Sequence, residues 1–175
     1  MTSPKRTSRR AKGLSLGEML LSLAITGALL AAVAVAFQVS LKSYGDNQNI
    51  ADAAQMGRST LERLAREVRT ADEVTYTASQ LTLYPPAESG IQSLQYDFSG
   101  DKLYYRRTVG GTTSSFIALE NDANTTLTLF RVTGVTGVDF HNVNCTKTIT
   151  VELNLTVGHQ PLALTVSASP RRNQL

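Results

Sequence analysis

The sequence is poor in the side chains that most enzymatic and metal chemistry requires. Its 175 residues include one cysteine, two histidines and no tryptophan. A single cysteine, Cys145, excludes an intramolecular disulfide, so cysteine usage does not indicate the compartment. We expect an inert core thiol at this position. His141 and His159 have no metal-like spacing with each other or with Cys145, so we predict no metal centre.

Nucleotide-binding and hydrolase fingerprints are also missing. The sequence has no Gly-x-Ser-x-Gly, no Walker motif and no dinucleotide-binding glycine pattern. The stretch 120–126 offers Glu120, Asp122 and Asn124 as oxygen ligands, and a calcium site there is the alternative to a plain turn. Because Asp and Asn collect in loops for turn chemistry alone, we prefer the turn. We therefore predict neither an enzyme nor a cofactor.

The net positive charge of the chain comes from its first 13 residues. The sequence holds 17 basic and 14 acidic residues, and residues 1–13 contain five of the basic ones and none of the acidic ones. The remainder is negative by two charges. Composition therefore gives no support for nucleic-acid binding by the body of the protein.

Residues 14–37 form an apolar run in which Glu18 is the only charge. As a helix these 24 residues reach about 36 Å, which is enough to cross a bilayer core of about 30 Å. A basic segment before such a run predicts a cytoplasmic N-terminus and an extracytoplasmic remainder. A carboxylate inside hydrocarbon costs about 2.5–3.5 kcal/mol, so Glu18 requires an explanation.

Two ordinary interpretations of this run leave Glu18 unexplained. A secretory signal peptide would be cut after Ala36, where Ala34-Val35-Ala36 supplies small residues at the required spacing. However, the run is longer than the usual apolar region of about 7–15 residues. A plain signal anchor accommodates the length but gives the carboxylate no role.

The sequence GLSLGEMLLSLAI, residues 13–25, resembles the class III leader junction of type IV pilins and pseudopilins. The resemblance implies that a prepilin peptidase cuts between Gly13 and Leu14 and that Leu14 becomes the N-methylated first residue. Glu18 is then the fifth residue, one helical turn from a cationic amine, and a buried charge is tolerated when it is paired. In a filament the amine of a neighbouring subunit could take that place.

This sequence departs from the family pattern at two positions. Leu14 stands where phenylalanine or methionine is more usual, and Gly17 stands where a large aliphatic residue is expected. Gly17 costs about 1 kcal/mol of helix propensity relative to alanine. Neither departure removes Gly13 or Glu18, the two positions that carry the implied chemistry.

Residues 38–72 predict a continuation of the helix with an amphipathic pattern. Its apolar stripe repeats at helical spacing, at Leu61, Leu64, Ala65, Val68 and Ala71. The intervening charged residues predict a solvated face, with Glu62 and Arg66 as an i, i+4 pair. Gly45, Asp46 and Asn47, within 43–49, mark a point where the helix could kink or break.

Residues 73–175 change to a period of two, with β-rich runs separated by turn signals. Gly100-Asp101, Gly110-Gly111 and the stretch 158–161 predict hairpins. No helical pattern intervenes, so we predict one mainly antiparallel sheet with a face on the helix. The predicted fold class is α+β, a pilin-like lollipop in four parts: the cleaved leader 1–13, the transmembrane and assembly helix 14–37, the amphipathic helix 38–72 and the β head 73–175.

The resemblance implies a structural role. The pattern of a helical stretch at 58–74 followed by short hairpins is similar to minor pseudopilins of the J type and minor pilins of the W type. Such a subunit would serve a type II secretion, type IV pilus or competence filament. Its partners would be the prepilin peptidase, other pilin or pseudopilin subunits and the bacterial inner membrane. The alternatives are a secreted β-rich binding or adhesion domain cut after Ala36, and a membrane-anchored enzyme.

Overall fold

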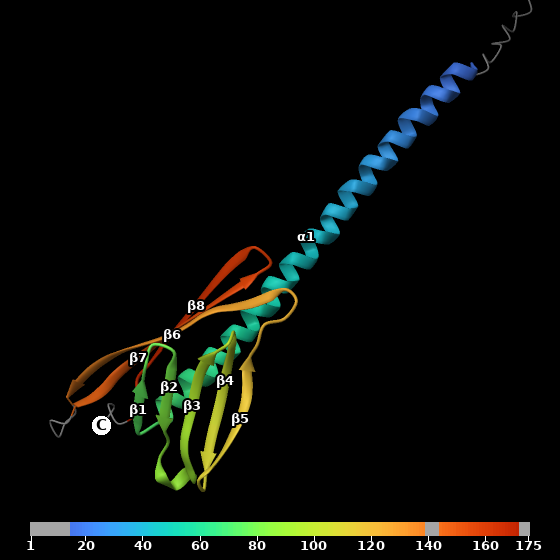
Figure 1. The fold of residues 1–175 in the computed structure, drawn as a ribbon. Coiled ribbons are helices and arrows are strands. Elements are labelled where there is room, and N and C mark those ends of the chain that lie inside the picture. The colour runs from blue at the N-terminus through green and yellow to red at the C-terminus, as the bar shows by residue number, and fades with distance from the viewer. Residues whose placement is uncertain (1–14, 139–143, 172–175) are drawn as a thin grey trace, which may run out of the picture. The chain divides into compact units, whose positions relative to one another are not determined.

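The computed structural model describes residues 15–138 and 144–171. One long helix is followed by a short 3₁₀ turn and eight strands (Figure 1). Their bounds are α1 Leu16–Thr70, β1 Glu73–Tyr76, β2 Gln80–Tyr84, η1 Ala87–Ser89, β3 Ile91–Ser99, β4 Lys102–Val109, β5 Thr112–Leu119, β6 Thr125–Val138, β7 Asn144–Val157 and β8 Gln160–Ala168. The chain divides into two compact units, one ending at Gly45 and one starting at Asp46.

Helix α1 is 55 residues long and continues through the stretch 43–49. The interruption considered at Gly45, Asp46 and Asn47 therefore does not occur. One glycine costs about 1 kcal/mol and Asp and Asn only a few tenths each, which a long cooperative helix tolerates. The helix ends at Thr70. Two residues later the amide of Asp72 donates to the carbonyl of Tyr84 at 2.9 Å, which joins the chain to strand β2.

In the second unit, the C-terminal part of α1 buries the predicted stripe. The exposed fraction is at most 4% for each of its five members, Leu61, Leu64, Ala65, Val68 and Ala71. The basic side chains on the other side of the helix are exposed, as predicted. The ion pair that forms is Arg63 with Glu67, with 3.0 Å between Nε and Oε1. Among the described residues, the predicted pair of Glu62 with Arg66 is not formed.

The strands form two antiparallel sheets, so the prediction of a single sheet is wrong. Sheet A has the order β1-β2-β3-β4-β5, and sheet B has the order β6-β7-β8. The predicted hairpin turns are confirmed at Gly100-Asp101 and Gly110-Gly111, all four with positive φ. The loop at 120–124 ends sheet A, and β6 and β7, each 14 residues long, pair with each other instead of with β5.

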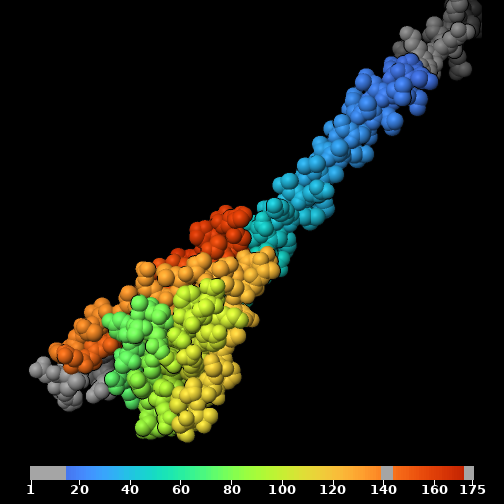
Figure 2. Space-filling model, viewed as in Figure 1, coloured from blue at the N-terminus to red at the C-terminus, as the bar shows by residue number. Residues whose placement is uncertain are grey.

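Both sheets contribute to one core in the second unit. Strand β7 buries alternate residues along the side facing the core, Ile149, Val151, Leu153, Leu155 and Val157. Helix α1 comes so close to these strands that a Cβ on Gly57 would lie 2.5 Å from Cδ1 of Leu164. Figure 2 shows β3, β4 and β5 as a continuous surface beside β6. Cys145, predicted in the core, is only half-buried near the start of β7, where the strand leaves the core.

Candidate functional site

The first turn of α1 contains a reciprocal pair of hydrogen bonds between Ser15 and Glu18. The Ser15 amide donates to Oε2 of Glu18 at 2.8 Å, and the Glu18 amide donates to Oγ of Ser15 at 3.2 Å. This is a capping box, in which both residues satisfy amide groups that have no partner within the helix. The Ser-x-x-Glu spacing is visible in the sequence, and it is the signal that reasoning from the membrane cost of Glu18 missed.

Of the three predicted site residues, only Glu18 is described by the structure. Gly13 and Leu14 lie outside the described residues, so the pairing of Glu18 with a Leu14 amine stays a prediction. The capping box uses Oε2 of the carboxylate. Gly17 is exposed, and a Cβ there would meet only Oγ of Ser15, at 3.9 Å. No close contact with another described residue requires glycine at this position.

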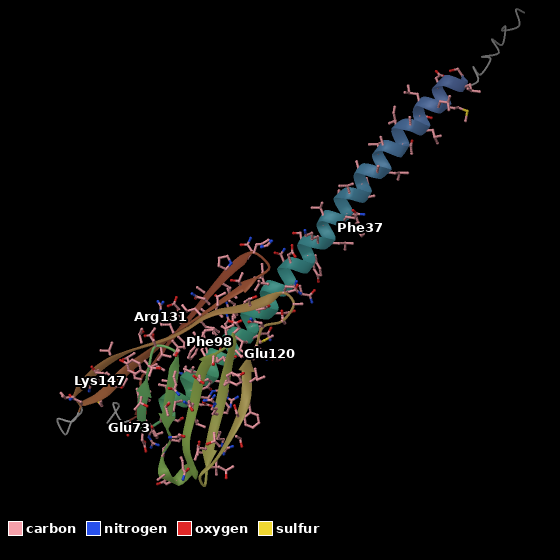
Figure 3. All side chains as sticks on the ribbon, viewed as in Figure 1. Phe37, Glu73, Phe98, Glu120, Arg131 and Lys147 are labelled. Atoms are coloured by element: carbon pink, nitrogen blue, oxygen red, sulfur yellow. The ribbon has the colours of Figure 1, made fainter. Side chains whose placement is uncertain are left out.

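From Leu16 to Leu41 helix α1 has apolar side chains on every side, and none of the described residues covers them. Its large side chains are 53–79% exposed: Leu16, Met19, Leu20, Leu21, Leu23, Ile25, Leu29, Leu30, Val33, Val35, Phe37, Val39 and Leu41. Figure 3 shows Phe37 extending from the bare helix. Within the described residues this helix alone is long and apolar enough to cross a membrane.

Two hydroxyl groups inside the apolar run are satisfied by the helix itself. Ser22 donates to the carbonyl of Met19 at 3.0 Å, and Thr26 donates to the carbonyl of Ser22 at 2.8 Å. Such bonds remove the cost of placing a free hydroxyl in an apolar environment. The sequence of the helix also has no charged residue between Glu18 and Lys42.

A group of polar contacts in the head joins α1 to sheet A. The carboxylate of Glu67 accepts two hydrogen bonds, from Nε of Arg63 at 3.0 Å and from the hydroxyl of Tyr96 at 2.8 Å. The Arg63 guanidinium stacks 4.0 Å from the centre of the Tyr105 ring. Burial, reinforced by the charge of Glu67 and its hydrogen bond, raises the pKa of Tyr96 well above its usual value. These four groups satisfy one another and fasten the helix to the sheet.

The stretch 120–126 is organised as a turn. The carboxylate of Asp122 accepts the amides of Asn124 and Thr125 at 2.7 and 2.6 Å, and these bonds lower its pKa. Glu120 instead pairs with Lys102 at 3.1 Å. The described residues hold no group of three or more His, Cys, Asp or Glu side chains that could bind a metal. Glu120 and Asp122, two of the three residues considered as calcium ligands, thus have partners within the chain.

The structure describes one of the two histidines. His159 occupies the turn between β7 and β8, as predicted, whereas His141 lies outside the described residues. Comparison with family models, with curated proteins and with solved structures finds no match to this chain.

Proposed function

We propose that this chain is a prepilin-type protein, a minor pseudopilin or minor pilin of a bacterial secretion or pilus filament. In this proposal the prepilin peptidase cleaves between Gly13 and Leu14 and methylates Leu14. The helix then holds the subunit in the inner membrane, with the head outside, until the subunit enters a filament. The role is structural and requires no cofactor.

The observation that carries the proposal is a long helix with apolar side chains exposed on all sides and an acidic first turn. Exposed apolar surface of this extent requires lipid or other helices to cover it. A filament of packed helices and a membrane both meet this need at different stages. The head supports the proposal in a general way, because it buries its own core and leaves the helix as the part that needs partners.

Glu18 has two possible roles, helix capping and charge pairing with an amine, and these can be tested separately. Its Oε2 accepts the Ser15 amide, while its negative charge is what the N-terminal amine of a neighbouring subunit would meet. A glutamine can still cap, because the capping box accepts Glu or Gln at this position, but it carries no charge. Comparing the two substitutions therefore distinguishes capping from pairing.

Filament assembly of Glu18 variants tests the proposal. We expect both Glu18→Gln and Glu18→Ala to insert in the membrane and to be processed, and both to lose assembly because the charge is gone. Assembly is measured as the sheared or cross-linked filament fraction in the bacterium that makes this protein. Ser15→Ala is the matched control: it costs about 1 kcal/mol of helix capping and should still assemble. Normal assembly of Glu18→Gln would contradict the pairing role.

The alternative is a secreted β-rich binding domain with a signal peptide cut after Ala36. In the structure the bond after Ala36 lies inside α1, more than 30 residues before the helix ends. Cleavage there would leave residues 37–70 as a helix with an exposed apolar start. The position of the mature N-terminus separates this alternative from the filament proposal.

A further inference from the structure

Strand β5 is an edge of sheet A with no further strand paired to it in the part of the chain that the structure describes. It is the last strand in the sheet, pairs with β4 alone, and has no charged residue in its sequence TTSSFIAL. Its register with β4 is regular from Thr112 to Ile117 and shifts at Ala118, so the stretch 112–117 contains no bulge. Phe116 and Ile117 are 57% and 49% exposed. Free strand edges are normally protected by charge, proline or a bulge, because they can pair with another chain.

The backbone of β5 offers a row of free hydrogen-bonding groups. Gly110 and Gly111 have φ of 56° and 80°, as in the two-residue turns of tight hairpins. The flanking residues Val109 and Thr112 pair directly, and such flanking pairs bond to each other. By alternation, the N–H and C=O groups of Thr113, Ser115 and Ile117 point toward the free edge. Figure 1 shows this edge with no strand beside it.

A hollow of about 390 Å³ lies on one face of the sheet, over β4 and β5. It is lined by Arg107 and Val109 of β4 and by Thr112, Ser114 and Phe116 of β5. Arg107 pairs with Ser114 across the two strands, and because serine is short, the guanidinium can extend over it toward the edge. The hollow thus combines one cation with apolar side chains at both ends.

Arg107 differs from its neighbour Arg106 in its ion pairing. Its neighbour Arg106 pairs with Asp97 at 3.2 Å, whereas Arg107 forms no ion pair within residues 15–138 and 144–171. A second copy of this edge would bring another Arg107 and no acidic side chain, since β4 and β5 contain none. Charge complementarity therefore favours a different chain.

We propose that β5 binds an extended segment of another protein, which adds a strand to sheet A and places an acidic side chain against Arg107. Main-chain hydrogen bonds to the edge provide affinity, and the hollow provides specificity through alternate side chains of the added strand. An aliphatic residue on each side of the acid fits beside Phe116 and Val109. The inference rests on the head alone and does not depend on the filament proposal.

The test uses the isotope-labelled full chain in detergent micelles and the peptide Thr-Val-Thr-Glu-Thr-Val-Thr. We expect saturable changes in the amide resonances of Thr113, Ser115 and Ile117 as peptide is added. A control peptide with lysine in place of the glutamate should bind about fivefold more weakly, because a partly exposed ion pair contributes up to about 1 kcal/mol. Arg107→Glu should reverse the preference between the two peptides.

Two variants serve as controls. Ser115→Pro removes an outward N–H, which edge strands tolerate, and should weaken both peptides about fivefold or more. Arg58→Glu makes the same charge change on α1 and should alter neither affinity. The proposal is overturned if no β5 amide responds at millimolar peptide, or if Arg107→Glu leaves the preference unchanged. Thr113→Pro replaces Ser115→Pro if that variant does not fold.

Discussion

Gly57 and Gly45 lie in the same helix, but only one of them has a packing reason to be glycine. A Cβ at Gly57 would approach side-chain carbons of Leu164, Leu155 and Leu153 at 2.5, 3.2 and 3.4 Å. A Cβ at Gly45 would meet nothing within 4 Å. The absence of a side chain at Gly57 is what lets the helix contact sheet B closely.

Alanine substitutions at these two glycines should have opposite effects. We expect Gly57→Ala to lower the free energy of unfolding by about 1–3 kcal/mol through overpacking. We expect Gly45→Ala, the matched control, to raise helix stability by up to about 1 kcal/mol. Chemical denaturation of the full chain in detergent, followed by circular dichroism, measures both. Equal effects of the two substitutions would contradict the close contact at Gly57.

At residue scale, the sequence showed that Glu18 needs a partner but not which one. The structure supplies one partner, Ser15, by a rule of helix termini that applies in soluble proteins as well. Buried positions on α1 were predictable, because periodicity alone identifies a stripe. The ion pair of Arg63 with Glu67 was not predictable. Glu67 also accepts a hydrogen bond from Tyr96, which is 29 residues away in sequence, and only the fold brings these two residues together.

At the scale of elements, Tyr96 and Glu67 join α1 to sheet A. The Tyr96 side chain is almost fully buried, and its hydroxyl lies 2.8 Å from Oε2 of Glu67. Removing the hydroxyl with Tyr96→Phe should cost about 1.5–3 kcal/mol at neutral pH, the range for a hydrogen bond to a charged group. Urea unfolding of wild type and variant measures the difference.

The same contact predicts a pH dependence at alkaline pH. Burial first, and Glu67 second, raise the folded-state pKa of Tyr96 above its ordinary value of 10.0. A raised pKa favours folding while the unfolded tyrosine is still protonated, and this contribution is lost as pH rises above about 10. The advantage of wild type over Tyr96→Phe should therefore shrink above about pH 10, by up to about 1.4 kcal/mol per pH unit. A constant difference from pH 8 to 11 would contradict it.

Most strands and turns could be predicted from the sequence, but the division of the strands between two sheets could not. Alternation and paired glycines identified the hairpins at Gly100-Asp101 and Gly110-Gly111. The division into two sheets depends on β6 and β7 pairing over their whole length, which no local pattern specifies. The turn built by Asp122 contributes to this division, since it separates β5 from β6. The helix continues through residues 43–49 because helix formation is cooperative, so a few residues of low helix propensity do not end it.

At the scale of the whole molecule, the described core belongs entirely to one unit. The buried apolar residues begin at Ala53, within the unit that starts at Asp46. The fragment 46–175 should therefore fold alone and stay in solution without detergent, with unfolding that is cooperative in urea. Tryptophan is absent, so near-ultraviolet circular dichroism of the tyrosines is the readout. An aggregated or non-cooperative fragment would show that the first unit contributes to the stability of the head.

The mature N-terminus is the most direct test of the central claim that the chain is a processed filament subunit. Mass spectrometry of the protein purified from the membranes of the cells that make it gives this terminus and its modification. We expect a chain that begins at Leu14 with one added methyl group on the amine. A chain that begins at Phe37, or one that retains residues 1–13, would contradict the claim.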